Sequence, residues 1–271
     1  MKRLNLVGLV AAALVATPLA AQGQLILATT TSVRDAGLLD TLLPPFEQET
    51  GITVRVIAVG SGQAMALGRR GEADIMILHD PPNEERFMAD GFGIDRRYLM
   101  HNEFVLVGPP GDPAHVKGHP VADAFRLIAA ARAPFVTRGD HSGTNQKEIA
   151  VWAAASITPS GDWYRETGQG MGATLQIADQ TGAYTLTDIG TWLNNKAPFS
   201  LEVVAQGDSI LVNPYHVIRE NPERFPRINQ ADALRLANYL TGREAHDIIA
   251  TYGIPRFGRP LFTPADAARG P

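Results

Sequence analysis

The chain has 271 residues, 45% of them hydrophobic, which is enough for one large globular domain or two small ones. It contains no cysteine, which excludes disulfides, thiolate metal sites and a lipid-modified cysteine near the N-terminus. The formal net charge of −4 argues against nucleic acid or an anionic membrane as a partner.

Residues 1–21 have the layout of a secretory signal peptide: a short basic region, an uncharged apolar run over 6–15, and small residues after it. The run is shorter than the roughly 20 residues that a membrane helix needs. Cleavage after Ala21 or after Gly23 fits the pattern. The peptide holds two of the 24 basic residues and no acidic one, so the mature chain has 22 basic against 28 acidic side chains and a charge of −6. We therefore expect a soluble protein exported to the periplasm.

The first half of the chain alternates β-rich runs with helical patterns, which is typical of an α/β fold with a mainly parallel sheet. Proline lacks an N–H and clashes with the preceding turn, so Pro44-Pro45 predict a break or kink in the first helix. In chain order we expect strands at 25–28, 53–59, 74–78 and 103–107, and helices at 33–48, 63–70 and 83–90.

Residues 108–113 hold two glycines and three prolines, which mark a turn or domain boundary before a second α/β region. The elements expected there are helices at 121–132, 145–155, 163–167, 186–194, 231–240 and 244–251, and extended segments at 135–137, 175–178, 201–205 and 209–212. This order predicts two lobes: residues 22–104 with 211–271 form the discontinuous lobe I, and residues 105–210 form lobe II. The chain then crosses between the lobes twice, near 104–108 and 207–212.

Three hydroxyl-rich turns each follow a predicted strand and precede a predicted helix, at 29–32, 60–62 and 138–144. A helix start leaves up to four N–H groups without intrahelical partners and adds about half a positive charge. With hydroxyls and an arginine beside it, such a start suits an oxygen-rich anion. Because Ser and Thr are also ordinary helix caps, one turn alone is a weak indicator. Two turns in lobe I and one in lobe II predict an anion in the cleft between the lobes.

Motifs spread from about residue 25 to about residue 260 carry a resemblance to a known family. They are Ala-Thr-Thr-Thr-Ser at 28–32, Gly-Leu-Leu-Asp at 37–40, Phe-Glu-Gln-Glu-Thr-Gly at 46–51, Val-Gly-Ser-Gly-Gln-Ala at 59–64, Gly-Glu-Ala-Asp at 71–74, Asn-Glu-Phe-Val-Leu-Val-Gly at 102–108, Arg-Gly-Asp-His-Ser-Gly-Thr at 138–144 and Ala-Tyr-Thr-Leu-Thr-Asp at 183–188. Together they resemble the periplasmic tungstate-binding component of tungstate ABC importers. His141 departs from the small acidic or polar residue expected there.

The resemblance implies a two-lobed periplasmic-binding-protein fold of the second type, whose two connecting strands act as a hinge. It implies a non-catalytic receptor without a cofactor, which binds tungsten only as the oxyanion and delivers tungstate or molybdate to an inner-membrane ABC permease. We expect it to be a monomer. The implied ligand contacts are the side chains of Thr30, Ser61, Arg138 and Thr144 and the backbone N–H groups of Thr31 and Gly143.

The chemistry of the donors bears on which anion fits. Tungstate and molybdate are fully deprotonated dianions at neutral pH, so a matching site offers only hydrogen-bond donors. Hydrogenphosphate keeps a proton and needs an acceptor, for which Asp140 is the candidate, although pairing with Arg138 is the favoured role. Tungstate and molybdate share charge and shape and are nearly equal in size. Molybdate, phosphate and sulfate therefore remain alternatives.

A periplasmic hydrolase with Ser61 as its nucleophile is the alternative from another class of protein. The run Val-Gly-Ser-Gly-Gln at 59–63 does not match the G-x-S-x-G elbow, and no base is assignable from the sequence. His115 and His119 have the spacing of a helical metal pair, but a glycine and a proline disfavour a helix there. Tyr184 could close over the ligand, but core packing is its favoured role. We expect Trp152, Trp163 and Trp192 to pack in the core or lie on the lobe surface, and His79 to be a surface or satisfied core histidine.

Overall fold

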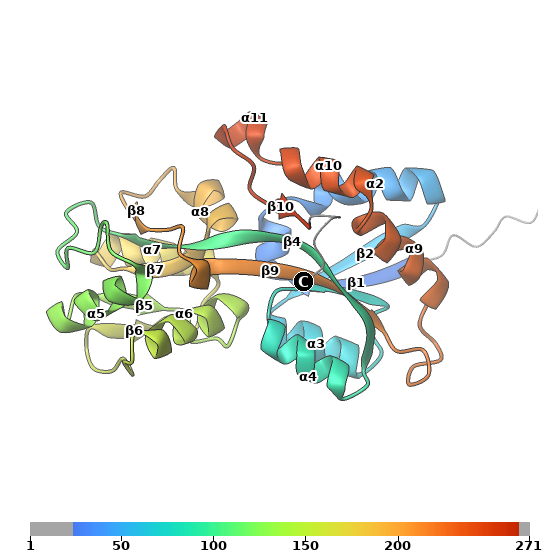
Figure 1. The fold of residues 1–271 in the computed structure, drawn as a ribbon, viewed down its shortest axis with the longest axis horizontal. Coiled ribbons are helices and arrows are strands. Elements are labelled where there is room, and N and C mark those ends of the chain that lie inside the picture. The colour runs from blue at the N-terminus through green and yellow to red at the C-terminus, as the bar shows by residue number, and fades with distance from the viewer. Residues whose placement is uncertain (1–23, 266–271) are drawn as a thin grey trace, which may run out of the picture.

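The computed structural model describes residues 24–265, which form two α/β lobes that share the long strand β4 (Gly93–Gly108) (Figure 1). The elements of lobe I are β1 (Gln24–Thr30), α1 (Thr31–Asp35), α2 (Leu39–Thr50), β2 (Thr53–Val59), α3 (Ser61–Arg69), β3 (Ile75–Leu78), α4 (Pro81–Ala89), β9 (Val212–Glu220), α9 (Gln230–Leu240), α10 (Arg243–Thr251), α11 (Ile254–Phe257) and β10 (Thr263–Pro264). Those of lobe II are α5 (Val121–Ala131), β5 (Phe135–Thr137), α6 (Gly143–Ala154), β6 (Tyr164–Glu166), α7 (Met171–Thr181), β7 (Thr185–Asp188), α8 (Ile189–Asn195), β8 (Glu202–Ala205) and the 3-10 turn η1 (Ser209–Leu211). The predicted α/β, two-lobed fold is confirmed.

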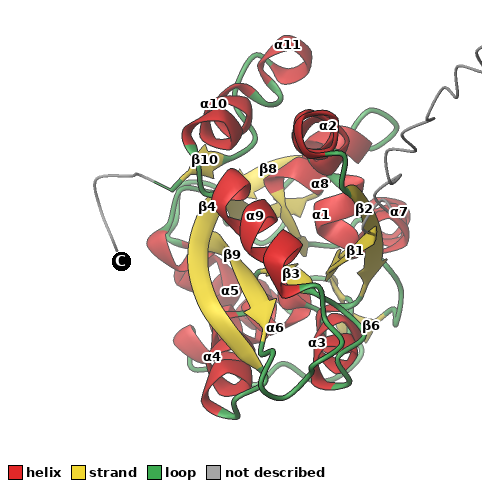
Figure 2. Ribbon diagram, turned by 90° about the vertical axis from the view of Figure 1, so that its right-hand side faces the viewer, coloured by secondary structure: helices red, strands yellow, loops and turns green. Residues whose placement is uncertain are grey.

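Within the described residues, the strand order of the lobe I sheet is β10-β4-β9-β3-β1-β2. Strand β1 runs parallel to β2 and β3, whereas β9 is antiparallel to both β3 and β4. Figure 2 shows α2 and α10 on one side of this sheet and α3 and α4 on the other. The carboxyl ends of β1 and β2 therefore meet at one edge of the sheet, where α1 and α3 begin.

Strand β4 changes partner where the chain passes from one lobe to the other. Up to Glu103, which lies opposite Val212, it pairs with β9; from Phe104, opposite Asp188, it pairs with β7 and then β8. The return crossing runs through η1 into β9. The lobe boundaries predicted from the sequence stay a prediction, which this change of partner supports.

Separate clusters of apolar side chains form the cores of the two lobes. Within lobe II, successive side chains of β4 point alternately into two of these clusters. Phe104 and Leu106 pack with Phe125, Phe135 and Trp152 against α5 and α6, whereas Val105 and Val107 face α7 and α8. This alternation follows from the two-residue period of a strand. Full burial of each such side chain contributes about 1.5–3 kcal/mol relative to exposure.

The two prolines predicted to break or kink the first helix lie inside α2, so the helix does not break at them. The break is at Gly37 instead, whose φ of +77° favours glycine and where an added Cβ would lie 2.7 Å from the Tyr252 hydroxyl oxygen. A proline in a helix interior costs about 3 kcal/mol. The two prolines therefore cost about 6 kcal/mol. The four buried side chains of α2, Leu39, Leu42, Leu43 and Phe46, offset this with about 6–12 kcal/mol in total, at about 1.5–3 kcal/mol each.

Four short elements differ from the prediction. Residues 163–167 contain a strand rather than a helix, 175–178 are helical, 186–188 end a strand instead of starting a helix, and 209–211 form a 3-10 turn. Pairing with a neighbouring strand decides such segments, because three or four residues carry too little periodicity to separate helix from strand.

Glu220 is a fully buried carboxyl group at the end of β9, and neither carboxyl oxygen has a hydrogen-bond partner within the described residues. Burial, reinforced by the charge of Asp74, raises the pKa of Glu220 to about 8 from the ordinary 4.5. Between these values the folded protein holds a proton that the unfolded chain releases, so the free energy of unfolding falls as the pH rises through this window.

We expect Glu220→Gln, which stays neutral, to remove this fall. At about pH 9 the variant should be more stable than the wild type by about 1–3 kcal/mol, and at about pH 5 nearly equal, as judged by urea denaturation. Exposed Glu49→Gln is the matched control. Parallel stability curves for wild type and Glu220→Gln would contradict a buried, protonated carboxyl.

No helix within residues 24–265 is long and apolar enough to cross a membrane. The predicted signal peptide lies outside the described residues.

Candidate functional site

The three predicted turns occur as strand, turn and helix start. Strand β1 ends at Thr30 and α1 follows; β2 ends at Val59 before α3; and β5 ends at Thr137 before α6. Thr30 and Ser142 cap their helices, since each hydroxyl accepts a hydrogen bond from the backbone N–H three residues on, that of Val33 and that of Asn145. The α3 helix has no side-chain cap, so its first N–H groups keep more of their capacity to bind a ligand.

A direct hydrogen bond joins the second and third turns across the two lobes. The Gly143 N–H donates to Ser61 Oγ at 3.2 Å, and both residues are buried. A side chain at Gly143 would meet the His79 ring, because a Cβ there would lie 2.8 Å from Cε1. Only glycine lets the start of α6 approach lobe I this closely.

Thr30 belongs to a cluster of buried polar groups around His79. The His79 Nε2 atom lies 3.1 Å from Thr30 Oγ1 and 3.2 Å from Ser32 Oγ, and Nδ1 lies 3.0 Å from Asn213 Oδ1. Tyr215 stacks on the ring at a centroid distance of 4.9 Å. Burial holds the pKa of His79 below its ordinary value, although Asp188 and the Asn213 hydrogen bond act in the opposite direction.

Sequence reasoning did not place His79 and Asn213 at the site, and it named Ser32 only as part of the first turn. The expectation of a satisfied core histidine is confirmed by the burial and bonding of His79, and the ring lies where the start of α6 meets lobe I. One signal was available: His79 directly follows β3, which pairs with β1 and ends at the same sheet edge.

Arg138 lies buried in the turn between β5 and α6 and is bound to Asp140. Its Nε and Nη2 atoms both donate to Asp140 Oδ2, while Oδ1 accepts the Ser142 N–H at 3.1 Å. Burial alone would raise the pKa of Asp140, but the Ser142 hydrogen bonds and the Arg138 charge hold it below its ordinary value. The predicted Arg138–Asp140 pairing is confirmed, and both carboxylate oxygens of Asp140 accept hydrogen bonds.

The remaining predicted contacts lie at the same helix starts. Thr31 is the first residue of α1, and Thr144, which is buried, is the second residue of α6. Among residues 24–265 hydrogen bonds join Ser61 to Gly143, but none joins Thr30 to Arg138 or Thr144.

The two lobes also touch away from this site. Asn194, on α8, donates to the carbonyl oxygens of Asp35 and Ala36 at 3.5 Å, and its Oδ1 accepts Arg256 Nη1 from α11 at 2.7 Å. Through Asn194, lobe II therefore contacts both the N-terminal and the C-terminal segment of lobe I.

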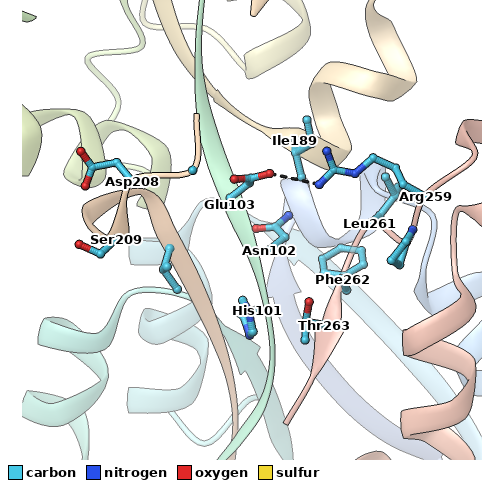
Figure 3. Close-up of a pocket in the computed structure, with 13 residues that line it drawn as sticks. His101, Asn102, Glu103, Ile189, Asp208, Ser209, Arg259, Leu261, Phe262 and Thr263 are labelled. Carbon is cyan, nitrogen blue, oxygen red and sulfur yellow. Dashed lines mark hydrogen bonds and ion pairs between the residues drawn. The ribbon is translucent and has the colours of Figure 1, made fainter. Parts of the chain in front are cut away.

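A separate cavity lies at the hinge, between β4, η1 and the segment that leads into β10 (Figure 3). Glu103 and Asp208 contribute carboxylates to its lining, and Glu103 pairs with Arg259 at 3.1 Å. Two carboxylates are unfavourable for an anion, so this cavity does not compete with the site at the three turns.

The other residues singled out from the sequence take structural roles. The buried Tyr184 hydroxyl donates to Asp112 Oδ1 at 2.7 Å within lobe II, which confirms core packing. Trp152 and Trp192 lie in the lobe II cores as expected. No group of three metal-ligating side chains occurs in the described part of the chain.

Comparison with known proteins agrees with this architecture. A family model described as a PBP superfamily domain matches residues 15–244. Tungstate-binding protein TupA of Peptoclostridium acidaminophilum is 44% identical over 247 residues, covering 90% of this chain and 86% of that protein. The crystal structure of the tungstate ABC transporter from Geobacter sulfurreducens is 45% identical with a TM-score of 0.79, covering 84% of this chain and 98% of that one. The tungstate-binding protein TupA from Desulfovibrio alaskensis G20 is 40% identical, also with a TM-score of 0.79, and covers 90% and 99%. The chain therefore belongs to the PBP superfamily, and within it to the family of these binding proteins.

Proposed function

We propose that this protein is a periplasmic receptor that binds a tetrahedral oxyanion, tungstate in the first place, between its two lobes. It then delivers the anion to an ABC permease in the inner membrane and acts as a monomer. The observation that carries the proposal is the meeting of helix starts from both lobes at the Gly143–Ser61 hydrogen bond. N–H groups and hydroxyls from two lobes can surround one anion there.

The proposed ligand contacts are donors: the hydroxyls of Thr30, Ser61 and Thr144, the guanidinium of Arg138, and the N–H groups of Thr31 and Gly143. Asp140, the carboxylate in the third turn, already accepts from Arg138 and from the Ser142 N–H. Because both of its oxygens are engaged, Asp140 is a poorer acceptor for a proton on the ligand than an unpaired carboxylate would be. This favours a fully deprotonated dianion over hydrogenphosphate.

The preference for tungstate over molybdate rests on the relatives, whose names state that they bind tungstate. Isothermal titration of the mature protein with tungstate, molybdate, sulfate and phosphate, at one pH and salt concentration, tests the proposal. We expect tungstate to bind most tightly. Tighter binding of phosphate, or no binding of any of the four anions, would refute it.

We expect Ser61→Ala to weaken tungstate binding by about 0.5–3 kcal/mol, because Ser61 contributes one hydrogen bond to a dianion. Titration calorimetry measures the change, with exposed Ser160→Ala as the control. The hydrolase alternative makes a different forecast. A nucleophile needs a base to take its proton, and within the described residues no hydrogen bond joins Ser61 Oγ to such a base, only to the Gly143 N–H. Covalent labelling of Ser61 together with ester turnover would favour the hydrolase.

We expect ligand binding to close the lobes through the crossovers at 104–108 and 207–212, since donors from both lobes contact one ion only when the lobes meet. Small-angle scattering should then give a smaller radius of gyration with saturating tungstate. Bound tungstate should raise the free energy of unfolding by about 2.7 kcal/mol when the free tungstate concentration is about a hundred times the dissociation constant. An unchanged radius together with an unchanged Tm would show that the site does not bridge the lobes.

A further inference from the structure

The hydrogen bonds around His79 determine which ring nitrogen carries a proton. The Asn213 amide nitrogen donates to Asn102 Oδ1 and lies 2.8 Å from the Tyr215 hydroxyl oxygen. With the amide nitrogen turned to these partners, Asn213 Oδ1 faces His79 as an acceptor, 3.0 Å from Nδ1. Nδ1 therefore carries a proton, and the neutral ring has its free lone pair on Nε2.

That lone pair faces two hydroxyls at the start of α1. Thr30 Oγ1 and Ser32 Oγ lie 3.1 and 3.2 Å from Nε2, and 3.0 Å from each other. Each hydroxyl has one proton to donate. With a neutral ring, at least one of these protons satisfies Nε2 and is withheld from any ligand. With an imidazolium, Nε2 donates, and both hydroxyl protons are free to turn outward.

Charged groups face the ring from several elements, so the charge of a bound anion acts on the ring together with theirs. Asp80 and Glu84 face it from the β3–α4 side, Asp188 from lobe II and the Tyr215 ring from β9, and Arg86 and Lys147 line the same inter-lobe groove. The start of α6, against the ring at Gly143, disfavours a cation through its dipole. Burial outweighs the three acidic groups and keeps the pKa of His79 low, so the ring is neutral before an anion arrives.

We propose that His79 is a positioning residue that takes up one proton at Nε2 when the dianion binds, so that Thr30 and Ser32 both donate to the ligand. This inference rests on the proposed function and adds Ser32 to its donors. The proton comes from solvent, no covalent bond of the ligand changes, and the hydrogen bond between Nε2 and the hydroxyl that donated to it reverses direction. The bound complex gains two negative charges from the anion and one positive charge from the proton.

Proton uptake has a measurable consequence for affinity. If binding requires one proton on a group that is neutral in the free protein, the dissociation constant rises with pH, by up to about tenfold per pH unit. A site with permanently charged donors alone would show a flat profile over the range in which tungstate stays fully deprotonated.

Titration calorimetry of the intact mature protein with sodium tungstate tests the inference. Runs in Tris and in Hepes at about pH 7.5 give the net proton uptake from their different ionisation enthalpies, and runs from about pH 6.5 to about pH 8.5 give the pH profile. The expected wild-type result is uptake approaching one proton and an affinity that falls with pH. His79→Gln should bind more weakly, with a flatter profile and almost no uptake. Exposed His119→Gln should behave as the wild type.

Wild-type binding with no proton uptake and a flat profile would overturn the role of His79, as would wild-type uptake by His79→Gln. Absence of tungstate binding by the wild type would refute the proposed function and this inference with it. If His79→Gln fails to fold, imidazole ¹⁵N shifts of the wild type decide. One histidine should change from the neutral to the imidazolium pattern on saturation with tungstate, and no such change overturns the proposal.

Discussion

Arg138→Ala is expected to weaken tungstate binding by about 2–5 kcal/mol, the cost of removing one member of a desolvated, hydrogen-bonded charge pair. Arg138 is buried, and the substitution leaves the Asp140 carboxylate without its guanidinium partner beside the incoming anion. Both the lost attraction and the uncovered negative charge act against binding. Calorimetric titration measures the loss directly.

Two further variants separate these contributions. Asp140→Asn in the Arg138→Ala background should recover part of the affinity, because it removes the unpaired charge. Arg138→Lys keeps a positive charge but loses the planar fork, so it should fall between wild type and Arg138→Ala. Exposed Arg132→Ala is the control. An Arg138→Ala protein with the wild-type dissociation constant would remove Arg138 from the site.

Gly143→Ala is expected to lower tungstate affinity by about 1–3 kcal/mol, the usual cost of an extra methyl group in a packed contact. The new Cβ would lie 2.8 Å from His79 Cε1 and 3.0 Å from Nδ1, so α6 must retreat from lobe I. The N–H that now reaches Ser61 retreats with it. Alanine is the better helix former, so the Tm without ligand should not fall.

Gly172→Ala is the matched control, since this residue is the second of α7 and its Cβ would meet nothing nearer than Asn195 Oδ1 at 4.0 Å. Comparing the two variants in calorimetry and scattering separates helix propensity from the approach of the lobes. Equal affinities for Gly143→Ala and Gly172→Ala would mean that the Gly143–His79 contact has no part in binding.

The local pattern of the sequence predicted the elements that carry the ligand turns. The strands at 53–59 and 135–137 have the predicted bounds, because β-branched and aromatic residues there are flanked by clear breaks. The first part of β4, residues 93–102, was missed. It is charged and only partly buried, and pairing with β9 rather than its own alternation makes it a strand.

The residues of the site could be predicted only in part from the sequence, again because some of them meet through contacts between distant segments. Thr30, Ser61 and Arg138 lie in turns that can be recognised in the sequence by their clustered hydroxyls or glycines. His79 and Asn213 are isolated residues that belong to no such motif. They reach one another only because β9 returns from the far end of the chain to pair with β3. Contacts between segments so far apart in sequence leave no local pattern.

That return of β9 also sets the order in which the molecule can assemble. The elements of lobe II lie in one continuous stretch, so they can form before the last part of the chain joins. The sheet of lobe I is incomplete until β9 enters between β3 and β4, which until then expose unpaired edges. Non-local pairing of this kind is slow, because the chain loses the entropy of closing a long loop before the contacts that stabilise the pair can form. Lobe II is therefore expected to gain protection from hydrogen exchange first during refolding, and the β3–β9 ladder last.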